Sequence, residues 1–282
     1  MVRDAGIVQT QPGPSPQLGT WVREAIQYRG LLRNLLARDL SVRYKNSVLG
    51  FLWTLLNPLL LMVAFTIVFQ VLLPTSIPHF PVFVLVGILA WNFCVGSVMG
   101  CIHSIVGNGD LVRKVFFPRE MLPLSVVLAN LVHFSLALSL VFVLLPVVGL
   151  PLGPLALWLP VTMLFQAAFL AGLGLLLAGV NVFLRDTEAV MDVVVLAWFF
   201  LTPIFYPLDV LWDKAIGSVN VGWLMHVVNP MASFISTYRL VLIDGAPPDP
   251  AFLARTFGES LLVLVVGYVV FKRLEPRFGE EL

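Results

Sequence analysis

The residues that could do chemistry in this sequence are few, and most of them lie between its apolar stretches. Asp209, Asp213 and Lys214 come nearest to a set that could hold a metal or a diphosphate, but they have no metal-ligand spacing. We interpret them as a solvated loop with a helix cap. His133 lies inside an apolar stretch with no acidic residue nearby in sequence, which favours a packing histidine over a proton relay. We therefore expect no catalytic residue and no metal ligand.

Composition defines the class of protein. Of the 282 residues, 59% are hydrophobic and 12% are charged, which is about half the charged fraction of a soluble globular chain. Several stretches of about 20 residues carry no charge, enough to cross ~30 Å of hydrocarbon. The sequence predicts an all-α polytopic membrane protein. Its net charge of +1 does not favour a nucleic-acid partner.

Six stretches have the length and apolarity of membrane-spanning helices. They cover about 51–73, 82–106, 121–148, 155–180, 189–206 and 256–271. Small residues spaced four apart predict close helix contacts in the second and fourth spans, at Gly96 and Gly100, Ala168 and Gly172, and Gly174 and Ala178. Residues 1–27 lack the pattern of a signal peptide or span, and we expect a flexible cytoplasmic tail.

The distribution of basic residues predicts the orientation. If the N-terminus lies inside, the segments on that side carry 14 of the 17 Lys and Arg residues. Both termini are therefore expected in the cytoplasm.

The segment 207–255 between the fifth and sixth spans contains the apolar sequence VGWLMHVVNPMASFISTYRLVLIDG. His226, Asn229, Pro230 and Arg239 interrupt this sequence, which makes it a poor seventh span. Two short re-entrant or interfacial half-helices hinged at Asn229 and Pro230 fit better. A structured loop resting on the lipid headgroups is the alternative.

Residues 28–46 are predicted to form an amphipathic helix that leads into the first span. Its leucines recur at helical spacing, and arginines lie mostly on its other faces. Such a helix lies in the membrane interface, either as a simple anchor or as a docking surface for a cytoplasmic partner.

A second basic stretch, GNGDLVRKVFFPRE at 107–120, lies on the same side. Asp110 is suitably placed at the start of a short helix, where a carboxylate can satisfy free backbone amides. We expect Phe116 and Phe117 to be exposed beside Arg113 and Lys114, which is unusual for a tight loop. The pattern favours a short peg that enters a groove on another protein.

Four motifs in this order support a family resemblance: RDLSVRYKNSVLGFLWTLLNPLL, GNGDLVRKVFFPREMLPLSVVLANLVHF, TPIFYP and NPMASFISTYRLVL. Together they resemble the permease subunits of ABC type-2 transporters, especially the branch that exports lipid-linked O-antigen, teichoic acid and related polysaccharides. The resemblance covers nearly the whole chain after residue 25. It implies a homodimer of six-span subunits in the bacterial inner membrane, bound to two copies of an ABC ATPase. An exporter of lipid or drug, or a membrane-embedded glycan-processing enzyme, is the alternative.

The resemblance also implies residue roles. ATPase coupling is expected at Arg38, Arg43, Tyr44, Asp110, Leu111, Arg113, Lys114, Phe116, Phe117 and Arg185. An outer gate is expected at Asn229, Pro230, Met231, Tyr238 and Arg239. None of the four lysines lies in a phosphate-binding G-x-x-x-x-G-K-[ST] context, so ATP and Mg are expected on the partner ATPase and no cofactor on this chain.

Aromatic residues are the candidate lining of a polysaccharide path, because aromatic faces stack on the C–H surfaces of sugar rings. The candidates are Trp53, Trp91, Phe93, Trp198, Phe199, Phe205 and Tyr206, in spans one, two and five or at the end of span five. For each residue, the alternative is an ordinary lipid-facing or interfacial aromatic.

Overall fold

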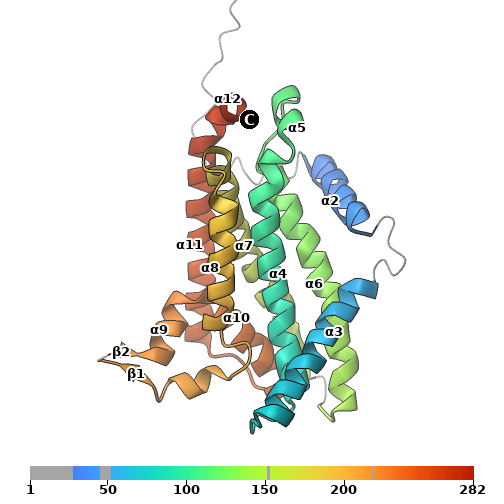
Figure 1. Ribbon diagram of the computed structural model, residues 1–282, viewed down its shortest axis with the longest axis vertical. Coiled ribbons are helices and arrows are strands. Elements are labelled where there is room, and N and C mark those ends of the chain that lie inside the picture. Colours follow the sequence, from blue (N-terminus) through green and yellow to red (C-terminus); the bar gives the residue numbers. More distant parts are fainter. Residues whose placement is uncertain (1–27, 45–51, 151–152, 218) are drawn as a thin grey trace, which may run out of the picture.

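The computed structural model describes residues 28–44, 52–150, 153–217 and 219–282. The predicted tail and residues 45–51, which include the end of the predicted amphipathic helix, lie outside the described residues. The described chain is an all-α bundle, with one antiparallel pair of two-residue strands, β1 (Ala215–Ile216) and β2 (Val219–Asn220) (Figure 1). The predicted fold class is confirmed.

Five helices of the described chain are long and apolar enough to cross a membrane. They are built on α3 (Leu52–Thr66) with the π-helical turn η1 (Ile67–Leu72), α4 (Phe80–Val106), α6 (Met121–Val147), α7 (Trp158–Phe183) preceded by η2 (Pro154–Leu157), and α11 (Pro250–Leu274). These match predicted spans one to four and six. The last helix begins six residues earlier than predicted, because Asp249 accepts hydrogen bonds from the first-turn amides of Ala251 and Phe252.

The predicted fifth span is shorter than expected. α8 (Thr187–Leu201) has 15 residues, about 22 Å at 1.5 Å per residue, whereas the hydrocarbon core is ~30 Å thick. The chain continues as a non-helical segment in which Thr202, Pro203 and Ile204 are buried. Non-helical backbone at membrane depth is tolerated where protein covers it, so a fifth crossing here would combine α8 with this buried irregular segment.

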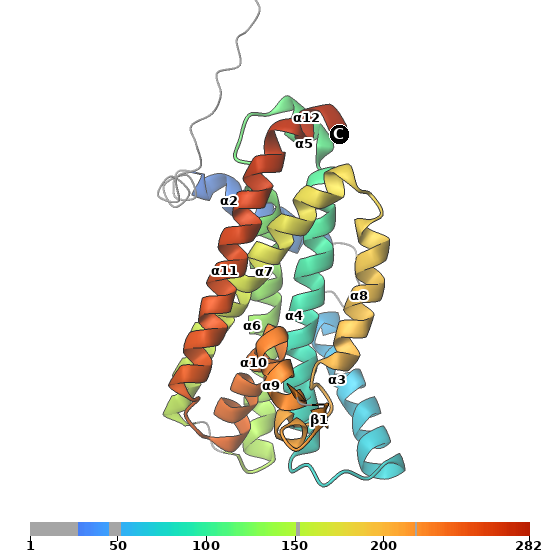
Figure 2. The same ribbon diagram turned by 90° about the vertical axis from the view of Figure 1, so that its left-hand side faces the viewer.

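The shorter elements gather at the two ends of the bundle. One end, here called the basic end, carries α5 (Gly109–Lys114), the turn between α7 and α8, η5 (Glu275–Arg277) and α12 (Phe278–Glu281), with α2 (Arg29–Tyr44) beside it (Figures 1 and 2). The other, the far end, carries η3 (Leu208–Leu211), the β pair, α9 (Val221–Val228), α10 (Pro230–Arg239) and η4 (Leu240–Asp244).

α4 is the central helix of the bundle and packs against α3, α6, α7, α8 and α10. In its most apolar stretch 78% of residues are buried, whereas the corresponding fraction in the first span is 6%. The exposed apolar surface of α3 must therefore be covered by lipid or by another subunit.

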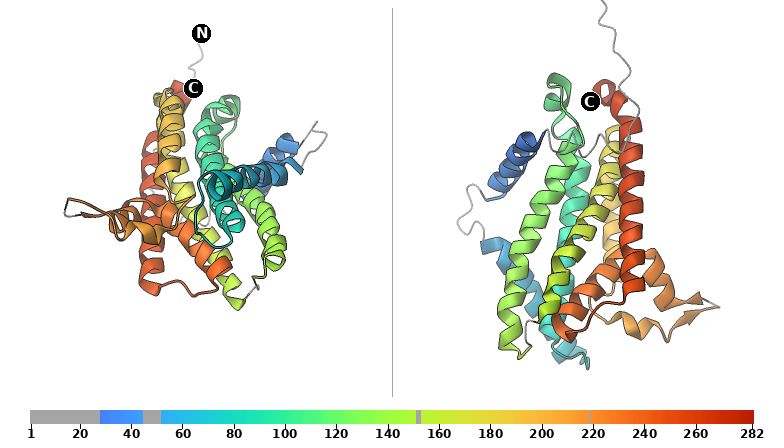
Figure 3. Two further views of the ribbon diagram at one scale, coloured as in Figure 1. Left: turned by 60° about the horizontal axis from the view of Figure 1, so that its bottom comes forward. Right: turned by 180° about the vertical axis from the view of Figure 1, so that it is seen from behind.

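Small residues bring neighbouring helices into close contact, as the sequence predicts. A side chain on Gly267 of α11 would overlap the backbone carbonyl of Gly172 in α7, and these two helices run side by side (Figure 3). In α4, Gly96 lies against Asn130 and Gly100 against Val126 of α6. Apolar side chains gain little by leaving lipid, so close packing of this kind stabilises a membrane bundle.

We expect opposite effects from one substitution at two glycines of α11. Gly267→Ala introduces a clash with Gly172 and should destabilise the protein by about 1–3 kcal/mol. Gly258→Ala meets no atom within 4 Å and should be neutral or stabilising by up to ~1 kcal/mol, because alanine favours helix. Thermal unfolding in detergent compares the two variants, and equal effects would contradict the predicted close contact.

Candidate docking end and membrane path

At the basic end, α2 is fixed to the bundle by both apolar and polar contacts. Leu35 is buried in the basic-end cluster, a set of buried side chains from α2, α4, α5, α6, α7, α11 and α12 and the loop after α5. Arg38 Nη1 donates to Asn108 Oδ1 at 3.0 Å, just before α5. Asp39 pairs with Arg38 at 3.2 Å and accepts from Ser125 Oγ of α6 at 3.2 Å. The expected roles of Arg43 and Tyr44 concern side chains outside the described residues.

The short helix α5 and the loop after it have one side packed against the bundle and one side exposed. Val112 and Phe117 are buried in the basic-end cluster, whereas Phe116 is 100% exposed. The prediction that both phenylalanines are exposed is therefore right for Phe116 and wrong for Phe117, because the chain turns into α6 and directs the second ring inward. The expected exposure of Arg113 and Lys114 is confirmed.

Asp110 lies in the first turn of α5, as predicted, and pairs with Lys114 at 3.2 Å. Leu111 packs against the basic-end cluster. Arg185 is exposed in the turn between α7 and α8, where Glu188 Oε1 lies 3.0 Å from His103 Nε2 of α4.

A buried carboxylate links the start of α6 to the end of α11. Glu120 is fully buried, and its Oε2 accepts from Lys272 Nζ at 2.9 Å; the same ammonium reaches Glu275 Oε2 at 3.0 Å. Burial raises the pKa of Glu120 above its ordinary value, and Lys272 opposes this rise. Arg119 also donates to the Glu275 carbonyl. The C-terminal segment is thus joined to the loop that carries α5.

Removing Lys272 should make stability strongly dependent on pH. In Lys272→Met, the pKa of Glu120 rises further, so the folded state favours its protonated form. The unfolded pKa is about 4.3, so stability is lost as the pH rises from that value through the folded pKa. We expect a deficit of about 3 kcal/mol at pH 8 and a smaller one at pH 5, measured by thermal unfolding.

The exposed Lys114→Met is the matched control, and we expect little change at either pH because surface ion pairs contribute little. Adding Glu120→Gln to Lys272→Met should remove most of the pH dependence. A deficit that is equal at both pH values and unrelieved by Glu120→Gln would contradict the role of this buried pair.

The predicted path aromatics form two separate groups. Trp91 of α4 lies against Trp198 and Phe199 of α8, with ring centroids 5.5 and 5.7 Å apart. Phe205 continues this group to Phe65 of α3 at 4.4 Å. Trp91 is buried within the subunit rather than facing lipid, and Tyr206 is only partly exposed. This aromatic ladder therefore joins α3, α4 and α8.

Trp53 and Phe93 belong to the second group. They line a cavity between α3, α4 and α6, together with His133 and the polar side chains of Thr54, Asn57, Asn92 and Asn130. Sequence reasoning considered only His133 among these polar residues. The available signal was a set of amides within stretches predicted to span the membrane, where polar groups are costly and often functional.

At the far end, α9 and α10 meet at Asn229, as the hinge prediction proposed. Asn229 Oδ1 accepts from the Ala232 amide of α10 at 3.3 Å and from Trp198 Nε1 at 2.9 Å. Its Nδ2 donates to Thr202 Oγ1 at 3.0 Å. The Asn229 side chain therefore caps the N-terminus of α10, which begins at Pro230, and joins α10 to the end of α8.

α10 packs against α4, α7 and α11, and most of its side chains are buried. Met231 and Tyr238 are fully buried. Tyr238 donates to Gln166 Oε1 of α7 at 2.8 Å, and Gln166 Nε2 donates to the Ala90 carbonyl of α4 at 3.0 Å. These candidate gate residues thus form part of the core.

Arg239 holds the non-helical segment that follows α8. Its guanidinium donates to the Phe83 carbonyl at 3.1 Å and to the Pro203 and Ile204 carbonyls at 2.6 Å each. It also lies 3.4 Å from the centroid of the Phe83 ring, in a cation–π contact. A side chain on Gly87 would come within 2.8 Å of the guanidinium. Glycine at position 87 has no side chain and therefore leaves room for the guanidinium of Arg239.

We expect Arg239→Met to unfold at a markedly lower temperature. It leaves up to three buried carbonyls without a donor, at about 1–3 kcal/mol each, so the loss should exceed about 3 kcal/mol. Arg239→Lys should recover only part of the lost stability, because a single ammonium group cannot donate to all three carbonyls in the planar geometry of the guanidinium. The exposed Arg273→Met controls for loss of a positive charge, and similar unfolding temperatures for the two methionine variants would contradict the assignment.

The comparisons with known proteins agree with the predicted resemblance. A family profile described as "ABC-2 type transporter" matches residues 30–243. The chain belongs to the ABC-2 type transporter family. This transporter chain is 38% identical over 265 residues to the O-antigen export system permease protein RfbA of Myxococcus xanthus, which covers 93% of the chain and 98% of that relative.

Two further relatives extend the comparison. RfbA of Klebsiella pneumoniae, also an O-antigen export system permease protein, is 30% identical over 246 residues, 87% of this transporter chain and 92% of the relative. The polysialic acid transport protein KpsM of Escherichia coli is 21% identical over 248 residues, 86% and 92% of the two chains. Each alignment covers most of this chain and of the relative, so the family assignment applies to the bundle as a whole.

Proposed function

We propose that this chain is the permease subunit of an ABC exporter that moves a polysaccharide across the bacterial cytoplasmic membrane. The names of the relatives favour polysaccharide over lipid or drug as the exported compound. The structural observation that carries the proposal is the shape of α5 and the loop after it, where the exposed Phe116 stands beside Arg113 and Lys114 and the side chains of Val112 and Phe117 are buried. That shape suits insertion into a groove on a partner protein.

The proposed partners are two copies of an ABC ATPase bound to a homodimer of this chain. ATP and Mg would bind to those subunits, since this sequence contains no phosphate-binding loop. The substrate would be a lipid-linked glycan of the O-antigen, teichoic acid or cell-wall type. The exposed apolar face of α3 is the surface that suits a second permease subunit.

The proposed orientation puts the basic end and both termini in the cytoplasm. The described segments at that end carry Arg38, Arg113, Lys114 and Arg185, in accordance with the positive-inside rule. The far end, with α9 and the β pair, would then lie on the outer side of the membrane.

We propose that docking at α5 moves the basic end as one body. Leu35, Val112, Phe117 and Phe278 share one buried cluster, so a displacement of α5 would carry α2 and the C-terminal segment with it. A rigid-body shift of this kind would open a path along α3, α4 and α8, whose aromatic ladder offers faces for sugar rings. At the outer mouth, α9 is the movable part of the gate, because Trp223 and Val228 are exposed whereas α10 is buried.

Substitutions on α5 test the docking role. We expect Phe116→Ala with Arg113→Glu to reduce co-purification of the ATPase and polysaccharide export at least tenfold, while stability stays unchanged because both side chains are exposed. Phe200→Ala, which removes another exposed ring, on α8, is the matched control. Wild-type levels of association in the α5 variant would refute docking at this helix.

A further inference from the structure

The cavity between α3, α4 and α6 has the size and position of a ligand site. Its volume is about 390 Å³, at the lower end of the ~300–1,000 Å³ typical of small-molecule pockets. Asn92 lies twelve residues after the start of α4 and fourteen before its end, and His133 occupies the same position in α6. Both are therefore roughly 18–21 Å from either helix end. The cavity therefore lies about midway along α4 and α6, two of the helices that are long and apolar enough to cross a membrane.

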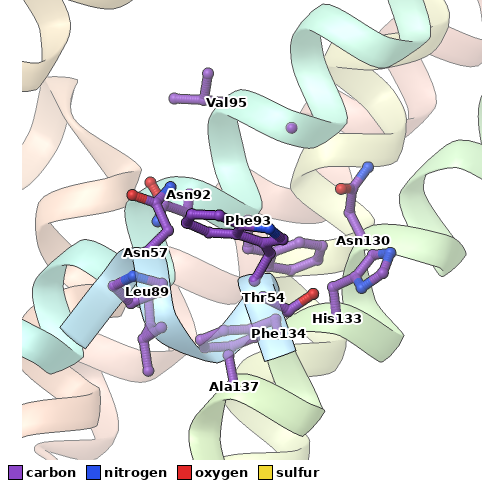
Figure 4. A pocket seen from close by; sticks show the side chains of 13 residues that line it. Thr54, Asn57, Leu89, Asn92, Phe93, Val95, Asn130, His133, Phe134 and Ala137 are labelled. Carbon is purple, nitrogen blue, oxygen red and sulfur yellow. The ribbon is translucent and has the colours of Figure 1, made fainter. Parts of the chain in front are cut away.

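The polar side chains of this cavity are arranged around an aromatic centre. Figure 4 shows Asn57 and Asn92 on one side, Asn130 and His133 on the other, and Phe93 and Phe134 between them. Phe93 and Phe134 stack at 5.3 Å with an interplanar angle of 10°. The cavity therefore combines apolar ring surfaces with amides from three helices.

The two sides differ in exposure. Asn57 and Asn92 are exposed, whereas Asn130 and His133 are buried. Asn92 stands out because most of α4 around it is buried. An amide exposed to hydrocarbon is costly, so the mouth of the cavity, at Asn57 and Asn92, must meet water or a polar ligand.

The polar back wall is built into the helix packing. Asn130 Nδ2 donates to the Val126 carbonyl at 2.9 Å. A side chain on Gly96 would come within 2.7 Å of Asn130 Oδ1, so glycine at this position leaves room for the amide. The close contact between α4 and α6 at Gly96 thus fixes Asn130 at the cavity wall.

The lining defines the chemistry of the ligand. None of the described residues that line the cavity is Lys, Arg, Asp or Glu. A phosphate or carboxylate group would require a cationic partner, and a cation would require an anionic one. Amides donate and accept hydrogen bonds, which suits hydroxyl groups, and aromatic rings suit the C–H faces of a sugar. The lining fits an uncharged, hydroxyl-bearing ring.

We propose that this cavity binds one uncharged sugar ring of the exported polysaccharide. The proposal rests on the proposed export function for its biological ligand. It assigns Asn57 and Asn92 to the mouth of the site, Phe93 and Phe134 to its stacking surface, and Asn130 to its back wall. The site is distinct from the ladder of Trp91, Trp198 and Phe205, which lies between α4, α8 and α3.

Photocrosslinking tests the binding site directly. The full-length chain, purified with the subunits that accompany it, is placed in phosphatidylcholine nanodiscs and exposed to dodecyl maltoside carrying a diazirine on its sugar. We expect crosslinks on α3, α4 and α6 around the cavity, with competition by unlabelled dodecyl maltoside and not by dodecylphosphocholine. Crosslinks scattered over the lipid-facing surface, or equal competition by both detergents, would overturn the proposal.

Asn92→Leu is the decisive variant, because the Asn92 side chain is exposed and leucine in its place should not disturb the packing of the bundle. We expect it to reduce crosslinking in the cavity about tenfold, whereas Gln70→Leu, at an exposed amide of η1, should leave crosslinking unchanged. Equal crosslinking in the two variants would overturn the proposal.

Export measured in cells separates this proposal from the function on which it rests. We expect Asn92→Leu to reduce polysaccharide export about tenfold. Wild-type export without cavity crosslinks refutes the sugar site and leaves the exporter function intact. Specific cavity crosslinks in a wild-type chain that exports no polysaccharide refute the exporter function and the proposed ligand source. Loss of crosslinks in Asn92→Leu without loss of export refutes a role of the site in transport.

Discussion

The guanidinium of Arg239 stabilises the non-helical, buried backbone that follows α8. The backbone after α8 leaves its helix within the region that should lie in hydrocarbon, where free carbonyls are costly. Arg239 donates to the carbonyls of Pro203 and Ile204, and to that of Phe83 in α4. Gly87 leaves the space in which the guanidinium lies. Because the donor comes from α10, the short helix α8 and the segment after it depend on the helix α10 beside them.

The two ends of the molecule are built on different principles. At the far end, Asn229, Tyr238 and Arg239 join α10 to α4, α7 and α8 through directional hydrogen bonds, which fix one geometry. At the basic end, α2, α5 and α12 share an apolar cluster with the long helices, and Lys272 bridges two carboxylates there. A force applied at α5 therefore reaches α11 through packed side chains, whereas hydrogen bonds hold α10 to α4, α7 and α8.

The sequence was sufficient for features that depend on local pattern. Hydropathy located five of the spans, because uninterrupted apolar stretches have few alternatives to helix. Small residues predicted the contacts at Gly96 and Gly172, and the Asn–Pro step predicted the hinge at residue 229. Features that depend on distant partners were missed. The end of α8 is set by an arginine 38 residues beyond Leu201, the burial of Phe117 by a cluster with residues of seven helices, and the amide-lined cavity by three helices.

The most direct test asks whether α8 and the segment held by Arg239 together cross the membrane. Cysteines are introduced singly at Arg185 and Asp213, both exposed, and labelled with an impermeant maleimide in cells whose outer envelope has been made permeable. Cys94 and Cys101 are buried and should contribute little background. The account predicts that Asp213→Cys is labelled from outside and Arg185→Cys only after lysis. Labelling of both from the same side would show that the chain returns without crossing, and would contradict the account.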